Sequence, residues 1–305
     1  MKKHSIRSYV QRTWQLYVLI LPALIWLALF CYWPMYGIQL AFRDFDFQKG
    51  LTGGDFVGLK YFMQYFTSPM FGTTMRNTFV ISLVSIIAGF PMPIILALVI
   101  NHIRQARAKK LVQTIVYMPY FISTVVMVSL IQIFCSPNGG IVTMALRAVH
   151  LIGEDTNLLG SAAAFVPLYV ISGIWQTCGW NSIIFIAALS AVDPQLYDAA
   201  KVDGVNMWQM VRYVEIPGIL PTILIVLILS MGGILSVGFE KTFLMQNGLN
   251  MSVSEVISTY VFNVGIKSYQ FSFGTAVGLF NNVINFFCLA VVNFISKRKA
   301  GIGLM

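Results

Sequence analysis

Charge is scarce in this chain. Of its 305 residues, only 10% are Asp, Glu, Lys or Arg, whereas 57% are hydrophobic and the mean hydropathy is +0.76. A soluble globular domain carries about 25% charged residues, because its surface faces water. The composition therefore excludes an ordinary soluble domain and requires a non-aqueous environment for much of the chain.

Motifs that bind nucleotides or catalyse hydrolysis are also lacking. The sequence has no G-x-x-x-x-G-K-[ST] phosphate loop, no H-E-x-x-H and no G-x-S-x-G. Its four cysteines are far apart and its three histidines lie near the ends of apolar runs, so neither a disulfide framework nor a metal site is predicted. The apolar runs contain no ionisable Asp, Glu, Lys or Arg, which argues against a proton-coupled carrier. Sodium coupling through carbonyl and hydroxyl groups stays open.

What the chain does have is long uncharged stretches. Six of them contain no Asp, Glu, Lys or Arg: 13–42, 77–103, 111–146, 156–192, 216–239 and 268–296. A helix of about 20 apolar residues crosses a bilayer core, and a helix satisfies its own backbone hydrogen bonds there. We therefore predict an all-α membrane protein with six transmembrane helices. Their expected positions are 15–38, 77–101, 115–136, 162–189, 218–239 and 273–296.

The predicted spans form one membrane domain over 15–296, between short tails at 1–14 and 297–305. Pro167, Gly173 and Gly179 punctuate the fourth stretch and leave a re-entrant segment open there, although one long span is simpler. On one side of the membrane, the tails and connecting loops hold 13 of the 20 Lys and Arg residues. The positive-inside rule makes that side, with both termini, cytoplasmic. Topology and anionic lipid headgroups account for the net charge of +9, so no nucleic-acid partner is expected.

The loop between the fourth and fifth predicted spans suggests two short helices with a sharp corner. Asp193 suits a helix N-cap and Pro194 the first helical position. Gly204 suits the residue just past a helix end, where a left-handed conformation is needed. Asn206 can cap a second helix, which Pro217 would end. The apolar stripe of this second helix is formed by Met207, Met210, Val211 and Val214. A short helix on a rigid corner is suited to docking into a cleft of another protein.

This loop resembles the EAA loop of ATP-binding-cassette (ABC) importer permeases, whose pattern is E-A-A-x-x-D-G-A, eight variable residues and I-x-L-P. The matching residues are Asp198, Ala199, Ala200, Asp203, Gly204 and Pro217. Asp198 replaces the Glu, Val205 replaces the third Ala, and the spacing is kept without a gap. The alternative, an amphipathic surface loop that matches by coincidence, requires topology and motif to agree by chance.

The resemblance implies a MetI-like fold, the type I ABC importer permease core, in a bacterial cytoplasmic membrane. It also implies a non-catalytic subunit that works with a second permease, two ATPase subunits and an external solute-binding protein. The coupling loop, residues 194–217, would dock on the ATPases. ATP and Mg would be held by those partners, and this chain would bind no cofactor itself.

A second resemblance concerns the cargo. Residues Tyr117–Ser123 and Ser136–Gly140 are similar to segments of maltose and multiple-sugar permeases, and most of all to the polysaccharide or oligosaccharide branch. This similarity implies a sugar or oligosaccharide as the solute. A peptide or another solute is the alternative within the same architecture. A polytopic enzyme acting on lipid-linked sugars is the alternative from another class, and it would need a carboxylate or metal cluster near the membrane interface.

Composition offers candidates for sugar contact, because aromatic rings pack on sugar faces and amides bond to hydroxyls. The candidates are Trp175, Gln176, Trp180 and Asn181 in the fourth span and Asn281, Asn282 and Asn285 in the sixth. Gln176 and Trp180 lie one helical turn apart on one face. The alternative is structural, since amides in membrane helices bond to neighbouring helices and Trp residues anchor spans at the interface.

Overall fold

The computed structural model describes residues 6–50, 54–301 and 303, and these residues form helices and two isolated β-bridges but no named strand. The helices are α1 (Ile6–Leu27), α2 (Trp33–Met35), α3 (Lys60–Phe66), α4 (Met70–Gly89), α5 (Pro91–Asn101), α6 (Ala106–Tyr117), α7 (Thr124–Phe134), α8 (Ile141–Ala148), α9 (Ala162–Ser190), α10 (Pro194–Val202), α11 (Met207–Met210), α12 (Ile216–Met231), α13 (Phe239–Met245), α14 (Met251–Ser254), α15 (Ile257–Tyr260) and α16 (Phe271–Ala300). Short 3₁₀ segments lie at Tyr36–Phe42 and Met118–Phe121, and π-helical turns at Ala28–Tyr32, Val211–Glu215 and Val261–Lys267.

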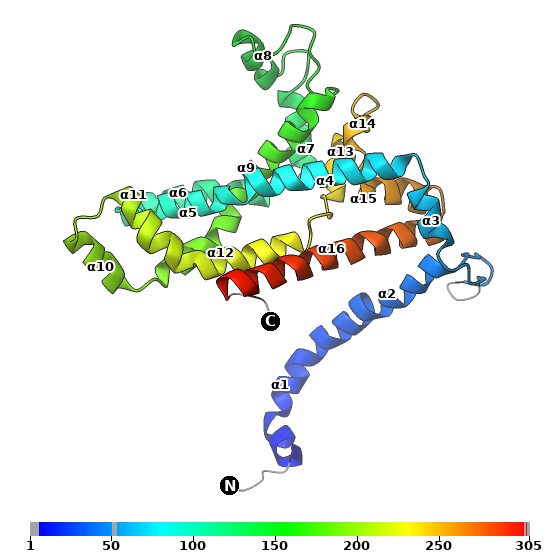
Figure 1. Cartoon of the computed structure of the whole chain (residues 1–305), viewed down its shortest axis with the longest axis horizontal. Coiled ribbons are helices and arrows are strands. Elements are labelled where there is room, and N and C mark those ends of the chain that lie inside the picture. Colours follow the sequence, from blue (N-terminus) through cyan, green and yellow to red (C-terminus); the bar gives the residue numbers. More distant parts are fainter. Residues whose placement is uncertain (1–5, 51–53, 302, 304–305) are drawn as a thin grey trace.

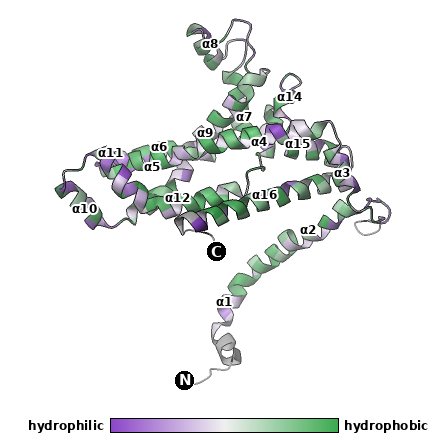
Figure 2. Ribbon diagram, viewed as in Figure 1, coloured by the Kyte–Doolittle hydropathy of each residue, from purple (hydrophilic) through white to green (hydrophobic). Residues whose placement is uncertain are grey.

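Helices α4, α5, α12 and α16 run roughly along one axis, with α10 and α11 at one end of the molecule and α3 and α15 at the other (Figure 1). Hydrophobic residues dominate α5, α12 and α16, whereas hydrophilic residues gather at α10 (Figure 2). The C-terminal end of α16 points toward the end that carries α10. This arrangement is that of a membrane bundle with a polar connection projecting from one end.

Five continuous helices are long and apolar enough to cross a membrane, and a bent pair would make six. The continuous ones are Thr13–Phe42, Met70–Asn101, Ala162–Ser190, Met207–Met231 and Phe271–Arg298. They confirm the first, second, fourth and sixth predicted spans to within a few residues at most ends. The fifth span was predicted too late in the sequence. It starts within the loop before it, and its helix ends at Met231, where Gly232 follows as the C-cap residue.

The third predicted span is not one straight helix. The segments Ala106–Phe121 and Thr124–Phe134 meet at 95°. Pro119 has no N–H to continue an α-helix, and Ile122 takes an extended conformation before the next helix. The Oγ of Ser123 then accepts a hydrogen bond from the N–H of Val126 and caps α7. Hydropathy alone predicted a continuous span here, because the residues on both sides of the break are apolar.

The fourth span is a single helix of 29 residues, so the re-entrant alternative is wrong. Pro167 lies in its second turn and does not interrupt it. Gly179 faces α6 at close range, because a Cβ placed there would lie 1.9 Å from the carbonyl oxygen of Val116. Gly179 is therefore required for the close contact between α9 and α6, and it does not break α9.

The first span diverges from the rest of the bundle, as Figure 1 shows for α1 and α2. None of its most apolar 18-residue window is buried within this chain. A bare apolar helix of this length needs lipid or another protein around it.

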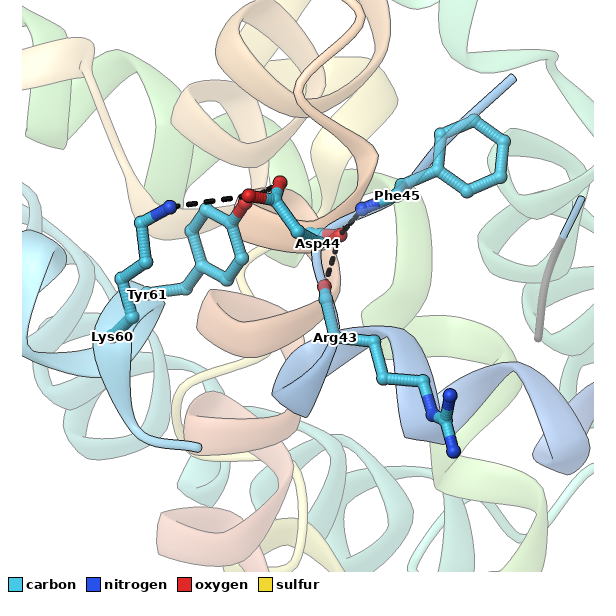
Figure 3. Close-up of polar contacts among 6 residues, drawn as sticks. Arg43, Asp44, Phe45, Lys60 and Tyr61 are labelled. Atoms are coloured by element: carbon cyan, nitrogen blue, oxygen red, sulfur yellow. Dashed lines mark hydrogen bonds and ion pairs between the residues drawn. The ribbon is translucent and has the colours of Figure 1, made fainter. Parts of the chain in front are cut away.

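The segment after the first span is fastened to both α3 and α16 (Figure 3). Asp44 accepts hydrogen bonds from the Tyr61 hydroxyl and from Lys60 Nζ, the latter at 3.2 Å. These two contacts, that of Tyr61 first, hold the pKa of the Asp44 carboxyl below its usual range. The Oγ of Ser272 donates to the carbonyl oxygen of Arg43 at 2.7 Å and accepts from the N–H of Phe45 at 3.0 Å. The end of the bundle opposite α10 is thereby closed by side-chain contacts.

Candidate coupling loop and transport cavity

The connection between α9 and α12 has the predicted helix–corner–helix form. The carboxylate of Asp193 accepts from the N–H of Gln195 at 2.9 Å and caps α10. Gly204 has a φ of +69°, the left-handed conformation that the sequence predicted. Its N–H donates to the Lys201 carbonyl at 3.2 Å, and the N–H of Val205 donates to the Ala200 carbonyl at 3.1 Å. This pair of bonds is a Schellman motif, which fixes the direction of the chain after the helix.

The second helix of the loop is capped as predicted but does not end where predicted. Asn206 and Gln209 form a reciprocal capping box. Pro217 was expected to end this helix, yet Met207–Met231 is continuous. A π-helical turn precedes the proline, and within it the N–H of Ile216 reaches the carbonyl of Val211, five residues back. The π turn shifts the hydrogen-bonding register just before Pro217, which has no N–H to donate. Helices α11 and α12 therefore form one continuous rod.

The predicted coupling residues differ in exposure. Asp198, Ala199, Asp203, Gly204 and Pro217 are exposed, while Ala200 is buried. Of the predicted apolar stripe, Met210, Val211 and Val214 pack inward and Met207 is exposed. Two large apolar side chains also project outward, Val202 at 87% and Trp208 at 83% exposure. The loop thus presents acidic and apolar groups together at the polar end of the bundle.

A buried carboxylate fastens this loop to two spans. Glu215 is 0% exposed and accepts from Asn101 Nδ2 at 2.7 Å and from the Tyr197 hydroxyl at 3.4 Å. Its other oxygen lies 3.1 Å from His102 Nε2. Tyr197 belongs to α10, Asn101 ends α5, and Glu215 ends the π-helical turn before α12, within the fifth span. We call these four residues the Glu215 cluster. It joins the loop to the second and fifth spans.

Sequence reasoning missed this cluster. The available signal was that Glu215 directly precedes the uncharged stretch 216–239, while His102 is the last residue but one of the stretch 77–103. Two polar groups at the same predicted membrane face can meet, but their pairing depends on how the helices pack.

A cavity of about 1080 Å³ lies between α4, α5, α9, α12 and α13. Three of the predicted sugar-contact residues line it: Gln176, Trp180 and Asn181. Two charged residues that were not predicted, Glu240 and Lys241, line it as well. The uncharged stretch ends at 239, so the sequence places these two residues outside the predicted spans.

The break in the third span lies beside this cavity. Trp180 stacks on Tyr120 with ring centroids 4.5 Å apart and an interplanar angle of 6°. Gln176 Nε2 donates to the Ile122 carbonyl at 2.8 Å, which satisfies a group that the break leaves without a helical partner. The family-like segment Tyr117–Ser123 is therefore the point where the chain bends and presents aromatic rings next to the cavity.

The remaining candidates lie elsewhere. Trp175, Asn281, Asn282 and Asn285 are not among the residues that line the cavity. The Asn285 side chain accepts from the N–H of Leu235 at 2.8 Å and donates to Ser236 Oγ at 3.0 Å. Its amide holds the turn that follows α12. Sugar contact by the asparagines of the sixth span stays a prediction.

Known proteins resemble the chain over nearly its whole length. Residues 89–301 match the family described as "Binding-protein-dependent transport system inner membrane component". The chain is 39% identical over 297 residues to the "Polygalacturonan/rhamnogalacturonan transport system permease protein YteP" of Bacillus subtilis (strain 168), covering 97% of this chain and 92% of that one. It is 36% identical over 294 residues to "Protein LplB" of the same organism, covering 96% and 92%.

Solved structures show the same relationship. A bacterial ABC transporter involved in the import of the acidic polysaccharide alginate contains a chain that superposes with a TM-score of 0.87 at 36% identity, covering 96% of this chain and 99% of that one. In the complex of the alginate transporter with an alginate pentasaccharide-bound periplasmic protein, the TM-score is 0.88, with 99% and 100% covered. The predicted family and the all-α permease fold are thereby confirmed. The chain belongs to the family of binding-protein-dependent transport system inner membrane components.

Proposed function

We propose that this chain is one of two membrane subunits that form the import pathway of an ABC transporter for oligosaccharides. A second permease completes the pathway, two ATPase subunits bind ATP and Mg²⁺ on the cytoplasmic side, and an external solute-binding protein delivers the sugar. The relatives named above support the cargo, since one is named for polygalacturonan and rhamnogalacturonan and the solved transporter imports alginate.

The coupling loop carries this proposal. It consists of two short helices held by an N-cap, a Schellman corner and a capping box, and its second helix is continuous with a transmembrane rod. Exposed Val202 and Trp208 offer an apolar surface, and Asp198 and Asp203 offer acceptors beside it. A rigid projection of mixed character at the basic, cytoplasmic side of the membrane is suited to a cleft on another protein. Contact with lipid alone, by contrast, does not account for the exposed acidic residues of the loop.

The mechanism follows from differential docking. Closure of the ATPases on ATP moves the loop, and the rod from Met207 to Met231 transmits the displacement into the bilayer. The Glu215 cluster passes it to the end of α5 through Asn101 and His102. The ATPases can favour one state only if they bind the loop more tightly in that state. The pathway then alternates between outward and inward openings while this chain makes no covalent step.

Purification and uptake test the proposal directly. The chain is expressed with its neighbouring permease, ATPase and binding-protein genes, and the complex is purified through a tag on this chain. We expect the ATPase subunits to co-purify and proteoliposomes to import oligosaccharides in an ATP-dependent manner. Uptake without ATP, or a stable complex that lacks ATPase subunits, contradicts the proposal. Import of peptides but not sugars favours the alternative cargo.

A further inference from the structure

Lys241 is a buried ammonium group at the wall of the transport cavity. It lies on α13 with 9% of its surface exposed. Its Nζ donates to the Tyr169 carbonyl at 2.7 Å and lies 4.6 Å from the centroid of the Tyr169 ring. Within the described part of the chain, no carboxylate oxygen lies within 4.0 Å of this Nζ. Among these described residues the ammonium therefore has no counter-ion, although it carries three hydrogen-bond donors.

Such a placement is costly and therefore informative. Taking an ion out of water is unfavourable even after the surrounding protein relaxes. The cation–π contact with Tyr169 offsets only part of this cost. Burial correspondingly lowers the pKa of Lys241 to about 8. Ionisable groups kept inside membrane proteins usually serve a substrate, an ion or a proton, and the opening of this site toward the cavity favours a solute.

The neighbouring helix is shaped around the ammonium. A Cβ at Gly173 would lie 3.2 Å from the Lys241 Nζ, so the absent side chain leaves room for the charge. Gly173, Gln176 and Trp180 are spaced three and four residues apart and share one face of α9. At 1.5 Å per residue, the row from Gly173 to Trp180 is about 10 Å long. A cation, an amide and an aromatic ring thus follow one another along a single wall.

We propose that Lys241 binds the carboxylate of an acidic sugar, a uronate, while the next part of the oligosaccharide lies along Gln176 and Trp180. This assignment rests on the proposed function and names the substrate class of the same pathway. One ammonium balances one carboxylate. A phosphate monoester, at about −1.5 to −2 charge near pH 7, would be left with a negative charge uncompensated.

Glu240 also lines the cavity and would repel an anion near its own position. It is exposed, whereas Lys241 is buried. Water and salt screen an exposed charge far more than a buried one. The attraction at Lys241 therefore exceeds the repulsion at Glu240, and the two together orient the sugar with its acid group toward α9.

The test uses the full transporter complex in proteoliposomes with two probes, a galacturonate trisaccharide and its carboxyl-reduced, neutral counterpart. Lys241→Gln keeps a hydrogen-bond donor for Tyr169 but removes the charge, and Lys241→Arg keeps the charge. Lys267→Gln is the matched control, because Lys267 also lies over aromatic rings but does not line the cavity. The quantity measured is the uptake of the acidic probe divided by the uptake of the neutral probe. The binding protein is the same in wild type and variant, so its own preference cancels when the two ratios are compared.

For Lys241→Gln we expect this ratio to fall by about tenfold or more, the usual worth of a charged hydrogen bond, with ATPase co-purification unchanged. Lys241→Arg and Lys267→Gln should keep the wild-type ratio. An unchanged ratio in Lys241→Gln overturns the assignment, and so does an equal loss of both probes, which would mean a packing role. A sugar phosphate serves as a third probe. If Lys241→Gln reduces the uptake of this probe alone, the site recognises phosphate and not carboxylate, which overturns the assignment. A wild-type complex that imports no sugar contradicts the proposed cargo itself and this assignment with it.

Discussion

Gly204 allows the cost of conformation to be separated from the cost of crowding at the coupling loop. Its φ of +69° lies in the left-handed region, and an added Cβ would meet no atom of this chain within 4 Å. Inside the chain, a substitution therefore costs only backbone strain. For Ala this is about 1–2 kcal/mol, which shifts a local equilibrium by a factor of about 5–30. Asn costs less, because it visits this region more readily.

The three variants Gly204→Ala, Gly204→Asn and Gly204→Val give a ranking that depends on the cause. If the corner must only keep its backbone shape, the loss of transport is smallest for Asn, intermediate for Ala and largest for Val. If the corner also approaches an ATPase closely, Asn is at least as damaging as Ala, because its side chain is larger. We expect the second order, with Val abolishing or strongly reducing transport.

The assay measures ATPase retained on the purified complex and ATP-dependent uptake, with membrane insertion of each variant as the control. Backbone strain in Gly204→Ala explains a loss of ATPase affinity of up to about 30-fold. A larger loss would indicate that the added side chain collides with the ATPase. Full ATPase binding and full uptake by Gly204→Val would falsify the coupling role of this loop. Wild-type behaviour of Asn combined with a defective Ala would reduce the role of Gly204 to backbone shape.

Three further predictions use the same complex. Glu215→Gln should lower stability by about 1–3 kcal/mol, because buried polar groups of its cluster lose a charged acceptor; thermal unfolding in detergent measures this, and an unchanged midpoint contradicts it. Trp180→Ala should reduce uptake with assembly intact, whereas Asn285→Ala should reduce assembly, since its amide holds the turn after α12; subunit co-purification distinguishes them, and the reverse pattern refutes both. With the four native cysteines replaced, impermeant thiol reagent added outside should label Leu249→Cys and not Val202→Cys, both exposed positions; the opposite result inverts the topology.

The sequence predicted features whose cause is local. The caps at Asp193 and Asn206 depend on side chains within three residues of the backbone groups that they satisfy, and the corner at Gly204 depends on backbone bonds that span at most five residues. Hydropathy likewise located most spans, because each transmembrane helix must pair its own backbone groups. Such features need no knowledge of the tertiary packing.

The features that sequence reasoning missed depend on residues far apart in the chain. The bend at Ile122 is stabilised by Gln176, 54 residues later. The partners of Glu215 at Asn101 and His102 are 114 and 113 residues away. Lys241 appeared to belong to an external loop because charge resumes at 240, and only the packing of α13 beside α9 brings it to the cavity. Hydropathy reports where a helix can cross a membrane, but it does not report where a buried charge is tolerated.

The packing also explains how one loop can act on the whole cavity. The rod that begins at Met207 lines the cavity with Leu229 and Ser230, so movement of the loop moves this wall directly. The Glu215 cluster grips the end of α5, and the same span lines the cavity at Phe90 and Pro93. Besides α9, which leads directly into the loop, two further walls are therefore connected to it: α12 by covalent continuity and α5 by the buried Glu215 cluster. Packed interfaces switch between discrete arrangements rather than deform continuously. Under the proposed coupling, a displacement of the loop would therefore reach the cavity walls formed by α12 and α5, next to the α9 wall that carries Gln176 and Trp180.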